Sequence, residues 1–282
     1  MTGKMHLLLS ALLIALLGPL PSFADSFTFS DPQPYIVTTG NPNDPQFTGN
    51  PGGFYNGVAK IDIFLSNGSA GCSGALVDPT HVLTAAHCLA PAALGGATIT
   101  AVDVSFPGGS TYIASSWIFD PLFNIRNIGA GNDLGIITLG SAAAGVTPYS
   151  LYTGPGLGAT VDIAGYGVTS SSGNDFGTLR HGQNQFDAGD SATYQYFFDS
   201  PGEVMTCFGD SGGPSFINGE LAGVHSFGDA RCSQYGVDDS IAQTANLTFI
   251  ETNSSASVPE PTSLLMLGPG LAAVAHFYRR RR

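Results

Sequence analysis

The stretch Cys207-Phe208-Gly209-Asp210-Ser211-Gly212-Gly213-Pro214 determines how the rest of this chain is interpreted. It holds a serine between glycines, with an acidic residue before the serine and a cysteine four residues upstream. A serine hydroxyl is a weak nucleophile, so it needs a base to take its proton and donors for the oxyanion that forms when it attacks a carbonyl. The glycines let the backbone N–H groups of Gly209 and Ser211 point into one small space. A glycine-rich turn before a strand is the alternative, and the rest of the chain decides between them.

The first 24 of the 282 residues have the pattern of a secretory signal peptide. Lys4 precedes an apolar run at residues 7–17, and Ser22 and Ala24 stand just before Asp25. The run is too short to span a membrane, and the small residues suit signal peptidase. We therefore expect an exported protein whose mature chain begins at Asp25.

Composition excludes some classes of partner. Residues 25–258 contain four basic and twenty acidic residues, a net charge of −16, which argues against nucleic acid or an anionic membrane surface. All four cysteines lie in this part, which indicates an oxidising compartment and two disulfides with three possible connectivities. No His/Cys set has zinc spacing, so we expect no metal and no cofactor.

The exported part predicts an all-β fold. Residues 25–53 are rich in Pro, Asn, Thr and Gly, and we expect an extended arm there. Short alternating or β-branched runs follow, separated by clusters of Gly, Pro, Asn and Ser. Such spacing is typical of a sandwich or barrel. The predicted strands cover residues 58–65, 74–77, 97–106, 135–139, 160–164 and 221–224.

A histidine and an aspartate flank two of these strands. His87 ends the apolar stretch Thr80 to Cys88, where it is expected to act as a general base, since histidine titrates near neutral pH. Asp133 precedes the apolar run 135–139 and is the candidate for orienting the His87 ring; a solvated turn aspartate is the alternative. The other histidines considered are interpreted as structural: His81, His181 and His225.

Three stretches together resemble the trypsin/chymotrypsin-like serine peptidases, in the order His, Asp, Ser. The resemblance covers about residues 57–250, and shorter matches support it at Gly165-Tyr166-Gly167, at Ser226-Phe227-Gly228 and at a C-terminal helix from Ala245 to Ile250. The stretches that carry it are Thr84-Ala85-Ala86-His87-Cys88, Asp133-Leu134-Gly135-Ile136-Ile137-Thr138-Leu139 and Gly209-Asp210-Ser211-Gly212-Gly213-Pro214.

The resemblance implies two six-stranded antiparallel β-barrels of chymotrypsin-like type, at about 54–148 and 149–253, with a short C-terminal helix. It implies that Ser211 is the nucleophile, His87 the base and Asp133 its orienting partner. The N–H groups of Gly209 and Ser211 would receive the oxyanion. These roles follow the family's established template and are not deduced from spacing.

The resemblance also implies a pairing of the cysteines and a substrate pocket. The disulfides would be Cys72–Cys88 and Cys207–Cys232. Where trypsin-like members carry a pocket aspartate, this chain has Met205, which favours apolar side chains before the cut. The other expected pocket residues are Ser226, Phe227, Gly228 and Gly236.

The N-terminal signature departs from the family pattern. The family begins its mature chain with Ile-Val-Gly-Gly, and the nearest match here is Ile36-Val37-Thr38-Thr39, about ten residues too far upstream. Asp210 is therefore expected either to receive a freed amine or to be satisfied by local donors.

Residues 254–282 look like a linker and a sorting signal. Val258-Pro259-Glu260-Pro261 precedes an apolar segment at 264–278, expected to be a hydrophobic helix, and four arginines at 279–282. The tail resembles the Pro-Glu-Pro (PEP-CTERM) signal that an exosortase processes in Gram-negative bacteria; a plain tail anchor is the alternative. We expect transient insertion in the inner membrane, cleavage near 258–261 from an accessible linker at 252–257, and release to the cell surface or medium.

The sequence thus predicts an exported serine endopeptidase acting on proteins or peptides. There are two alternatives: a catalytically silent binding module on the same scaffold, and an esterase that uses the same residues. A broken set of His, Asp and Ser would favour the binding module, whereas here the set is complete.

Overall fold

The computed structural model describes residues 37–38 and 41–258. The predicted signal peptide, Ile36 and the apolar tail segment at 264–278 lie outside these residues. Within the described ranges, no helix combines the length and apolar character that a membrane crossing requires.

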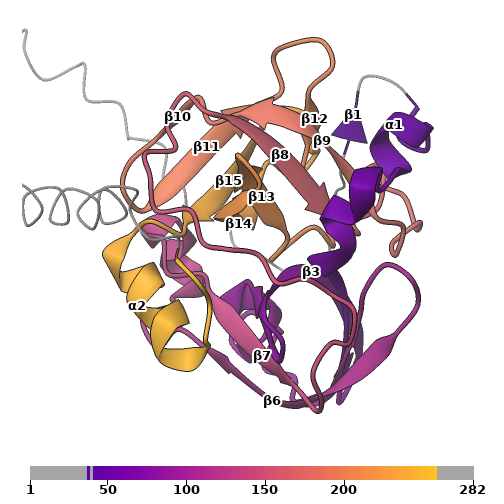
Figure 1. The fold of residues 1–282 in the computed structure, drawn as a ribbon, viewed down its shortest axis with the longest axis vertical. Helices are drawn as coiled ribbons and strands as arrows, with labels where there is room; N and C mark the ends of the chain where they lie inside the picture. Colours follow the sequence, from indigo (N-terminus) through magenta and orange to yellow (C-terminus); the bar gives the residue numbers. More distant parts are fainter. Residues whose placement is uncertain (1–36, 39–40, 259–282) are drawn as a thin grey trace, which may run out of the picture. The chain divides into compact units, whose positions relative to one another are not determined.

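The first half of the described chain forms a closed antiparallel barrel with the strand order β2-β3-β4-β7-β6-β5 (Figure 1). Its interior is apolar because alternate side chains of the strands, such as Ile61 and Ile63 on β2, point inward and are fully buried. The strands are β2 (Val58–Leu65), β3 (Gly68–Asp78), β4 (His81–Thr84), β5 (Ile99–Ser105), β6 (Thr111–Phe119) and β7 (Gly135–Leu139).

The second half forms a seven-stranded antiparallel sheet with the order β10-β11-β15-β14-β13-β8-β9. A separate two-stranded ribbon pairs β1 (Val37–Thr38) with β12 (Val204–Met205), and the helix α2 (Thr244–Asn253) ends the domain, as predicted. The strands of the large sheet are β8 (Thr160–Gly165), β9 (Arg180–Gln185), β10 (Ala188–Gly189), β11 (Thr193–Phe197), β13 (Pro214–Ile217), β14 (Glu220–Gly228) and β15 (Tyr235–Ser240).

The predicted all-β, chymotrypsin-like fold is confirmed, but the second unit is a half-barrel and not a closed six-stranded barrel. Among the described residues, no continuous ladder joins its two sides, and a single backbone bridge pairs Gln183 with Glu203. A side chain adds to this bridge: Asn184 Nδ2 donates to Phe197 O (3.0 Å) and to Val204 O (2.8 Å). Because the amide takes the place of ladder bonds, the β9 edge stays close to β11 and β12 without pairing with β11.

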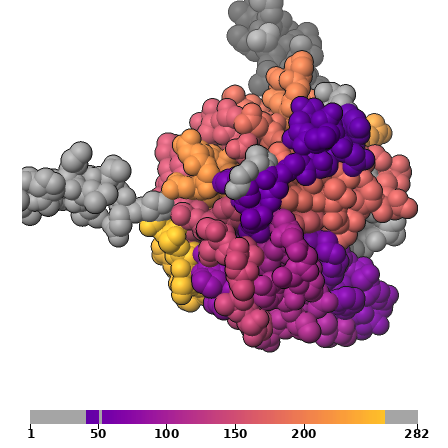
Figure 2. Space-filling model, turned by 45° about the vertical axis from the view of Figure 1, so that its right-hand side comes forward, coloured from indigo at the N-terminus to yellow at the C-terminus, as the bar shows by residue number. Residues whose placement is uncertain are grey.

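The segment predicted as an extended arm is partly helical. It contains α1 (Pro45–Thr48) and the 3₁₀-helix η1 (Pro51–Gly57). Asp44 caps α1, since its Oδ1 accepts from Gln46 N, and the following proline suits the first helical position. α1 lies beside β9, where His181 Nε2 donates to Gly49 O (2.7 Å); the indigo segment covers this part of the surface (Figures 1 and 2).

The segment after α2 is held against the domain and is not a free linker. Ser255 N donates to Asp78 Oδ2 (2.6 Å), and Leu151 N donates to Ser257 O (2.8 Å). Ala256 and Val258 are half-buried and pack against the larger apolar cluster. The predicted linker at 252–257 is therefore hydrogen-bonded to the domain, although Thr252, Ser255 and Ser257 are exposed. The accessibility of the cleavage site at 258–261 stays a prediction.

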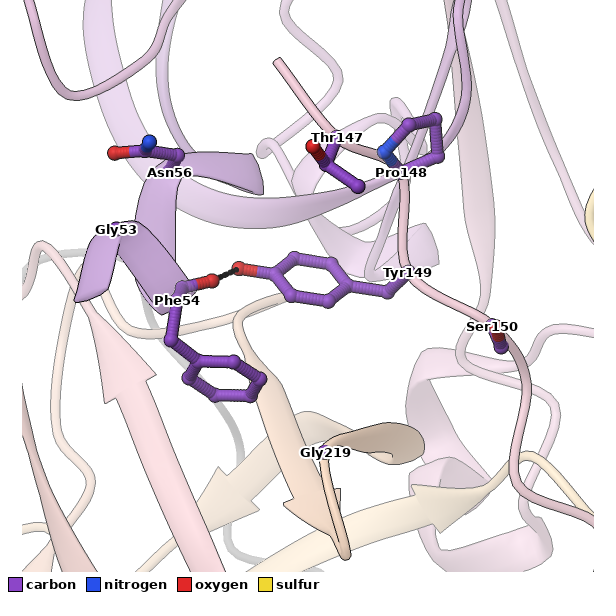
Figure 3. Close-up of a pocket in the computed structure, with 8 residues that line it drawn as sticks. All are labelled: Gly53, Phe54, Asn56, Thr147, Pro148, Tyr149, Ser150 and Gly219. Atoms are coloured by element: carbon purple, nitrogen blue, oxygen red, sulfur yellow. Dashed lines mark hydrogen bonds between the residues drawn. The ribbon is translucent and has the colours of Figure 1, made fainter. Parts of the chain in front are cut away.

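A surface pocket lies between η1, the segment 147–150 that connects the two β units, and the turn at Gly219 (Figure 3). Tyr149 crosses this pocket, and its hydroxyl donates to Phe54 O (2.7 Å). None of the residues predicted for catalysis or substrate binding lines it. The pocket is thus separate from the candidate active site.

Candidate active site

The first barrel positions His87 and Asp133. β4 pairs with β7 so that Thr84 lies opposite Gly135, which brings the residues beyond β4 and before β7 to the same end of the barrel. His87 lies in the short 3₁₀-helix η2 (Ala86–Cys88), just past the strand. Its Nδ1 is 2.6 Å from Asp133 Oδ2, and its backbone N–H donates to Asp133 Oδ1 (2.7 Å). Since Nδ1 donates to the carboxylate, the Nε2 lone pair is left free to accept a proton.

The second β unit adds two contacts to Asp133, which is fully buried. Ser226 Oγ, on β14, donates to Asp133 Oδ2 (2.6 Å), and Asp133 N donates to Asp239 Oδ2 on β15. The sequence predicted Ser226 only as a pocket residue and gave no role to Asp239. Asp133 therefore links the two units, and both β14 and β15 help to fix its position.

The turn that carries Ser211 packs against the first barrel. Ser73, on β3, donates from its backbone N–H to Ser211 O (2.8 Å) and from its hydroxyl to Gly209 O (2.7 Å). Gly212 has a φ of +81°, and a methyl group there would collide with Thr84 Oγ1 and Ser73 O, so only glycine fits. The Ser211 side chain is half-exposed, and no hydrogen bond joins its Oγ to His87 in the described part of the chain. Such contacts often form only when substrate binds.

Two backbone amides of this turn are available to a ligand. Asp210 N donates to Cys207 O (3.0 Å), whereas the amides on either side, of Gly209 and Ser211, donate to no acceptor among the described residues. Gly209 has a φ of +93°, in the left-handed region that favours glycine. The two predicted oxyanion donors thus have no competing partner within this part of the protein.

Asp210 is buried and satisfied by local donors, one of the two alternatives that the sequence left open. Its Oδ1 accepts from Gly167 N (2.8 Å) and its Oδ2 from Cys207 N (3.0 Å). Burial raises the pKa of its carboxyl to about 6. Added methyl groups at Gly165 or Gly167 would collide with this carboxylate, which explains the Gly-Tyr-Gly stretch.

Both disulfides implied by the resemblance are present. Cys72–Cys88 joins β3 to η2, directly beside His87, and Cys207–Cys232 joins the Ser211 turn to the connection between β14 and β15. No free cysteine remains among the described residues. The two cross-links therefore restrain the elements that carry the candidate base and the candidate nucleophile.

The predicted pocket residues lie around β14 and β15. Gly228 on β14 pairs with Gly236 on β15, and the ring of Tyr196 packs against Gly236 so closely that a methyl group would not fit. Met205 is fully buried in the smaller apolar cluster. Tyr196 hydrogen-bonds to Thr206, the residue between Met205 and the cysteine. The sequence analysis gave no role to Tyr196 or Thr206. Tyr196 lies on β11, whose two buried residues are both tyrosines, and this strand was not predicted.

Comparisons with known proteins agree with this geometry. The Trypsin family model matches residues 55–248. The chain belongs to the trypsin family of serine endopeptidases. It is 28% identical to a protein named trypsin from Saccharopolyspora erythraea, over 70% of this chain and 93% of the relative, and 30% identical to brachyurin from Leptuca pugilator, over 65% and 87%.

Solved structures of trypsin-like enzymes share the fold of this family member. Mouse neuropsin, a serine protease, superposes with a TM-score of 0.58 at 24% identity, over 71% of this chain and 94% of that chain. A structure titled HL collagenase gives a TM-score of 0.57 at 22% identity, over 71% and 93%. The PEP-CTERM protein-sorting motif matches residues 257–282, which agrees with the predicted sorting signal and indicates export.

Proposed function

We propose that the mature protein is an exported serine endopeptidase that cleaves peptide bonds through an acyl-enzyme on Ser211. The observation that carries this proposal is the 2.6 Å contact between His87 Nδ1 and Asp133 Oδ2. This contact lies at one end of the barrel. At the same end, the backbone N–H of Ser73 donates to Ser211 O and holds the Ser211 turn. A trypsin-family chain with this arrangement holds a base, its orienting group and a half-exposed hydroxyl on adjoining segments.

The proposed reaction uses the chain's own groups in two stages. His87 Nε2 takes the proton of Ser211 Oγ as the oxygen attacks the peptide carbonyl, and the oxyanion accepts from the amides of Gly209 and Ser211. His87 then gives the proton to the leaving amine, so that the C–N bond breaks and an ester to Ser211 remains. Water, activated by His87, hydrolyses that ester and restores the free hydroxyl.

We propose that the enzyme prefers apolar side chains before the cut. Met205 stands in place of the acidic pocket residue of trypsin-like members, and Gly228 pairs with Gly236 on the neighbouring strand. An apolar side chain gains about 25 cal/mol per Å² buried there, whereas a cation loses hydration without a partner. A peptide library should show cleavage after Leu, Met, Phe or Tyr, and a profile dominated by Lys or Arg would contradict the preference.

We propose that the exported precursor is processed at both ends, by signal peptidase near Asp25 and by an exosortase near residues 258–261. The sorting-motif match at 257–282 supports the second step. Mature protein from the native host should lack residues 264–282 and occur at the cell surface or in the medium. An intact tail on inner-membrane protein would contradict this processing.

Kinetics of two variants test the proposed activity. Ser211→Ala and His87→Ala should each lower kcat by about a millionfold, and the double variant should be little worse, because the residues act as a unit. Paired peptide and ester substrates separate a peptidase from an esterase. Peptidase activity of more than a few per cent in Ser211→Ala would contradict the proposed nucleophile.

A further inference from the structure

Two buried acids meet where the barrel and the half-barrel join. Asp133 precedes β7 of the first unit, and Asp239 lies on β15 of the second; both side chains are fully buried. The backbone N–H of Asp133 donates to Asp239 Oδ2. Asp239 therefore contacts the residue that orients His87, although nothing in the proposed reaction uses it.

The two carboxyl groups have very different partners. Asp133 accepts three hydrogen bonds, from the backbone N–H and the ring of His87 and from Ser226 Oγ. Asp239 Oδ2 accepts only from Asp133 N, and Asp239 Oδ1 has no partner among the described residues. One donor does not compensate a buried charge at Asp239.

The ionisable groups that face Asp239 oppose a charge on it. Those with the strongest effect are Asp133 from the loop before β7, Asp238 from the same strand and Asp120 from the loop after β6. The nearby His225 pairs with Asp238, its Nδ1 lying 2.8 Å from that residue's Oδ1. Burial, followed by the charge of Asp133, raises the pKa of Asp239 well above its usual range.

We propose that Asp239 is a positioning residue that acts in its neutral, protonated form: its carbonyl oxygen holds the backbone of Asp133 and thereby fixes the orientation of His87. The proposal rests on the proposed peptidase function. A neutral carboxyl accepts the Asp133 N–H as an amide would, and it does so without placing a second negative charge beside Asp133. The surroundings of Asp239 thus keep its carboxyl neutral while it holds the backbone of Asp133.

The proposal distinguishes two substitutions of the same residue. Asp239→Asn keeps a carbonyl acceptor of the same shape and no charge, so its kcat should stay within about threefold of the wild-type value. Asp239→Ala leaves the Asp133 N–H buried without an acceptor. Because small displacements of a catalytic group are costly, its kcat should fall by about ten- to a hundredfold, while KM stays nearly unchanged.

The pH profile tests the protonation state. If Asp239 is neutral, the midpoint of the acidic limb of kcat/KM should be the same in wild type and Asp239→Asn. Loss of an ionised neighbour would move that midpoint to lower pH by about half a unit or more. A shift of that size, or an inactive Asp239→Asn protein that is folded, would overturn the proposal.

A spectroscopic measurement separates this proposal from the proposed function. The proton on His87 Nδ1, in a short hydrogen bond to Asp133, should give a far-downfield NMR signal that does not depend on turnover. The signal should persist in Asp239→Asn and move or broaden in Asp239→Ala. Ile241→Val, a buried change just past β15, should lower the melting temperature and leave both the signal and kcat unchanged. Wild-type kcat and signal in Asp239→Ala would overturn the positioning role, and if Asp239→Ala does not fold, the comparison with Asp239→Asn decides alone.

Discussion

The two β units differ in how many polar side chains they bury. Apolar clusters lie in both units, and the larger cluster spans them. Among the described residues, the half-barrel buries more polar side chains than the barrel, including Arg180, Asp210, His225, Asp238 and Asp239. In the described part of the chain, all buried side-chain nitrogen and oxygen atoms without a hydrogen-bond partner belong to residues 180–246. The barrel is therefore held by hydrophobic burial, and the half-barrel carries polar groups at a cost in stability.

This difference assigns different tasks to the two units. The barrel supplies a rigid end on which β4 and β7 fix His87 and Asp133. The half-barrel supplies Ser226 and Asp239, which hydrogen-bond to Asp133 of the barrel unit. It also supplies the turn that carries Ser211. Unpartnered buried polar atoms persist mainly where they serve a function, so we expect loss of a buried apolar side chain in the barrel to cost more stability than loss of an unpartnered hydroxyl in the half-barrel.

The largest expected effect is at the residue where the two units meet. Asp133→Asn replaces the acceptor of the His87 ring proton with an amide and favours the wrong ring tautomer, so kcat should fall by about ten-thousandfold, as in the family's template enzyme. Initial rates at saturating substrate measure kcat directly. A loss below about tenfold would show that Asp133 does not orient His87.

Two truncations compare the cores. Ile63→Ala removes a fully buried side chain from the barrel and should lower the free energy of unfolding by about 2–5 kcal/mol. Ser215→Ala removes a fully buried hydroxyl of the half-barrel that has no partner among the described residues, and it should change stability by less than about 1 kcal/mol. Urea denaturation of both proteins provides the values. Equal losses would contradict the difference between the cores.

The same difference explains what the sequence could predict. The strands at 58–65 and 160–164 were found because alternating apolar residues mark the face that each strand buries, and the strand at 135–139 because it is a short β-branched run. β9, β11 and β15 were missed because the side chains they bury are largely polar or aromatic, for example Arg180 and Asp239. α1 was also missed, although Asp44 before Pro45 is a helix-start signal.

The candidate site was predictable only in part. Local motifs located His87, Asp133 and Ser211, because each lies in a stretch that resembles a family signature. The contacts of Asp133 to Ser226 and Asp239 join residues 93 and 106 positions apart, and no local pattern reveals such a pair. At the open edge of the half-barrel, the Asn184 amide and the bridge between Gln183 and Glu203 likewise join distant residues, and no local pattern reveals them.

The polar core should also make stability depend on pH through Asp210. Its pKa is 3.8 when exposed and about 6 in the folded protein, so burying the charge costs almost nothing below pH 3 and nearly its full amount above pH 7. The difference in unfolding free energy between Asp210→Asn and wild type should therefore rise by about 3 kcal/mol from pH 3 to pH 7 in favour of the variant.

Denaturation curves over that pH range measure this change. The nontitrating Ser215→Ala serves as the control and should run parallel to wild type, since it removes no ionisable group. A constant difference between Asp210→Asn and wild type would contradict a raised pKa of Asp210.

The smallest expected effect concerns the segment that docks on the barrel before the sorting motif. Asp78→Asn removes the acceptor of Ser255 N–H, so limited proteolysis at residues 254–258 should be faster by about three- to tenfold. His81→Ala removes the ring nitrogen that hydrogen-bonds to Asp78 Oδ2 but leaves the Ser255 contact, and it should not accelerate this cleavage. Equal cleavage rates in Asp78→Asn and wild type would show that Asp78 does not hold the segment.

Labelling by a fluorophosphonate tests the central claim most directly. The reagent forms a stable bond to an activated serine, and mass spectrometry identifies the labelled residue. Mature protein should carry the label on Ser211, His87→Ala should react far more slowly, and Ser211→Ala should carry none. Label on another residue, or rapid labelling that does not depend on His87, would contradict the assignment of Ser211 as the nucleophile.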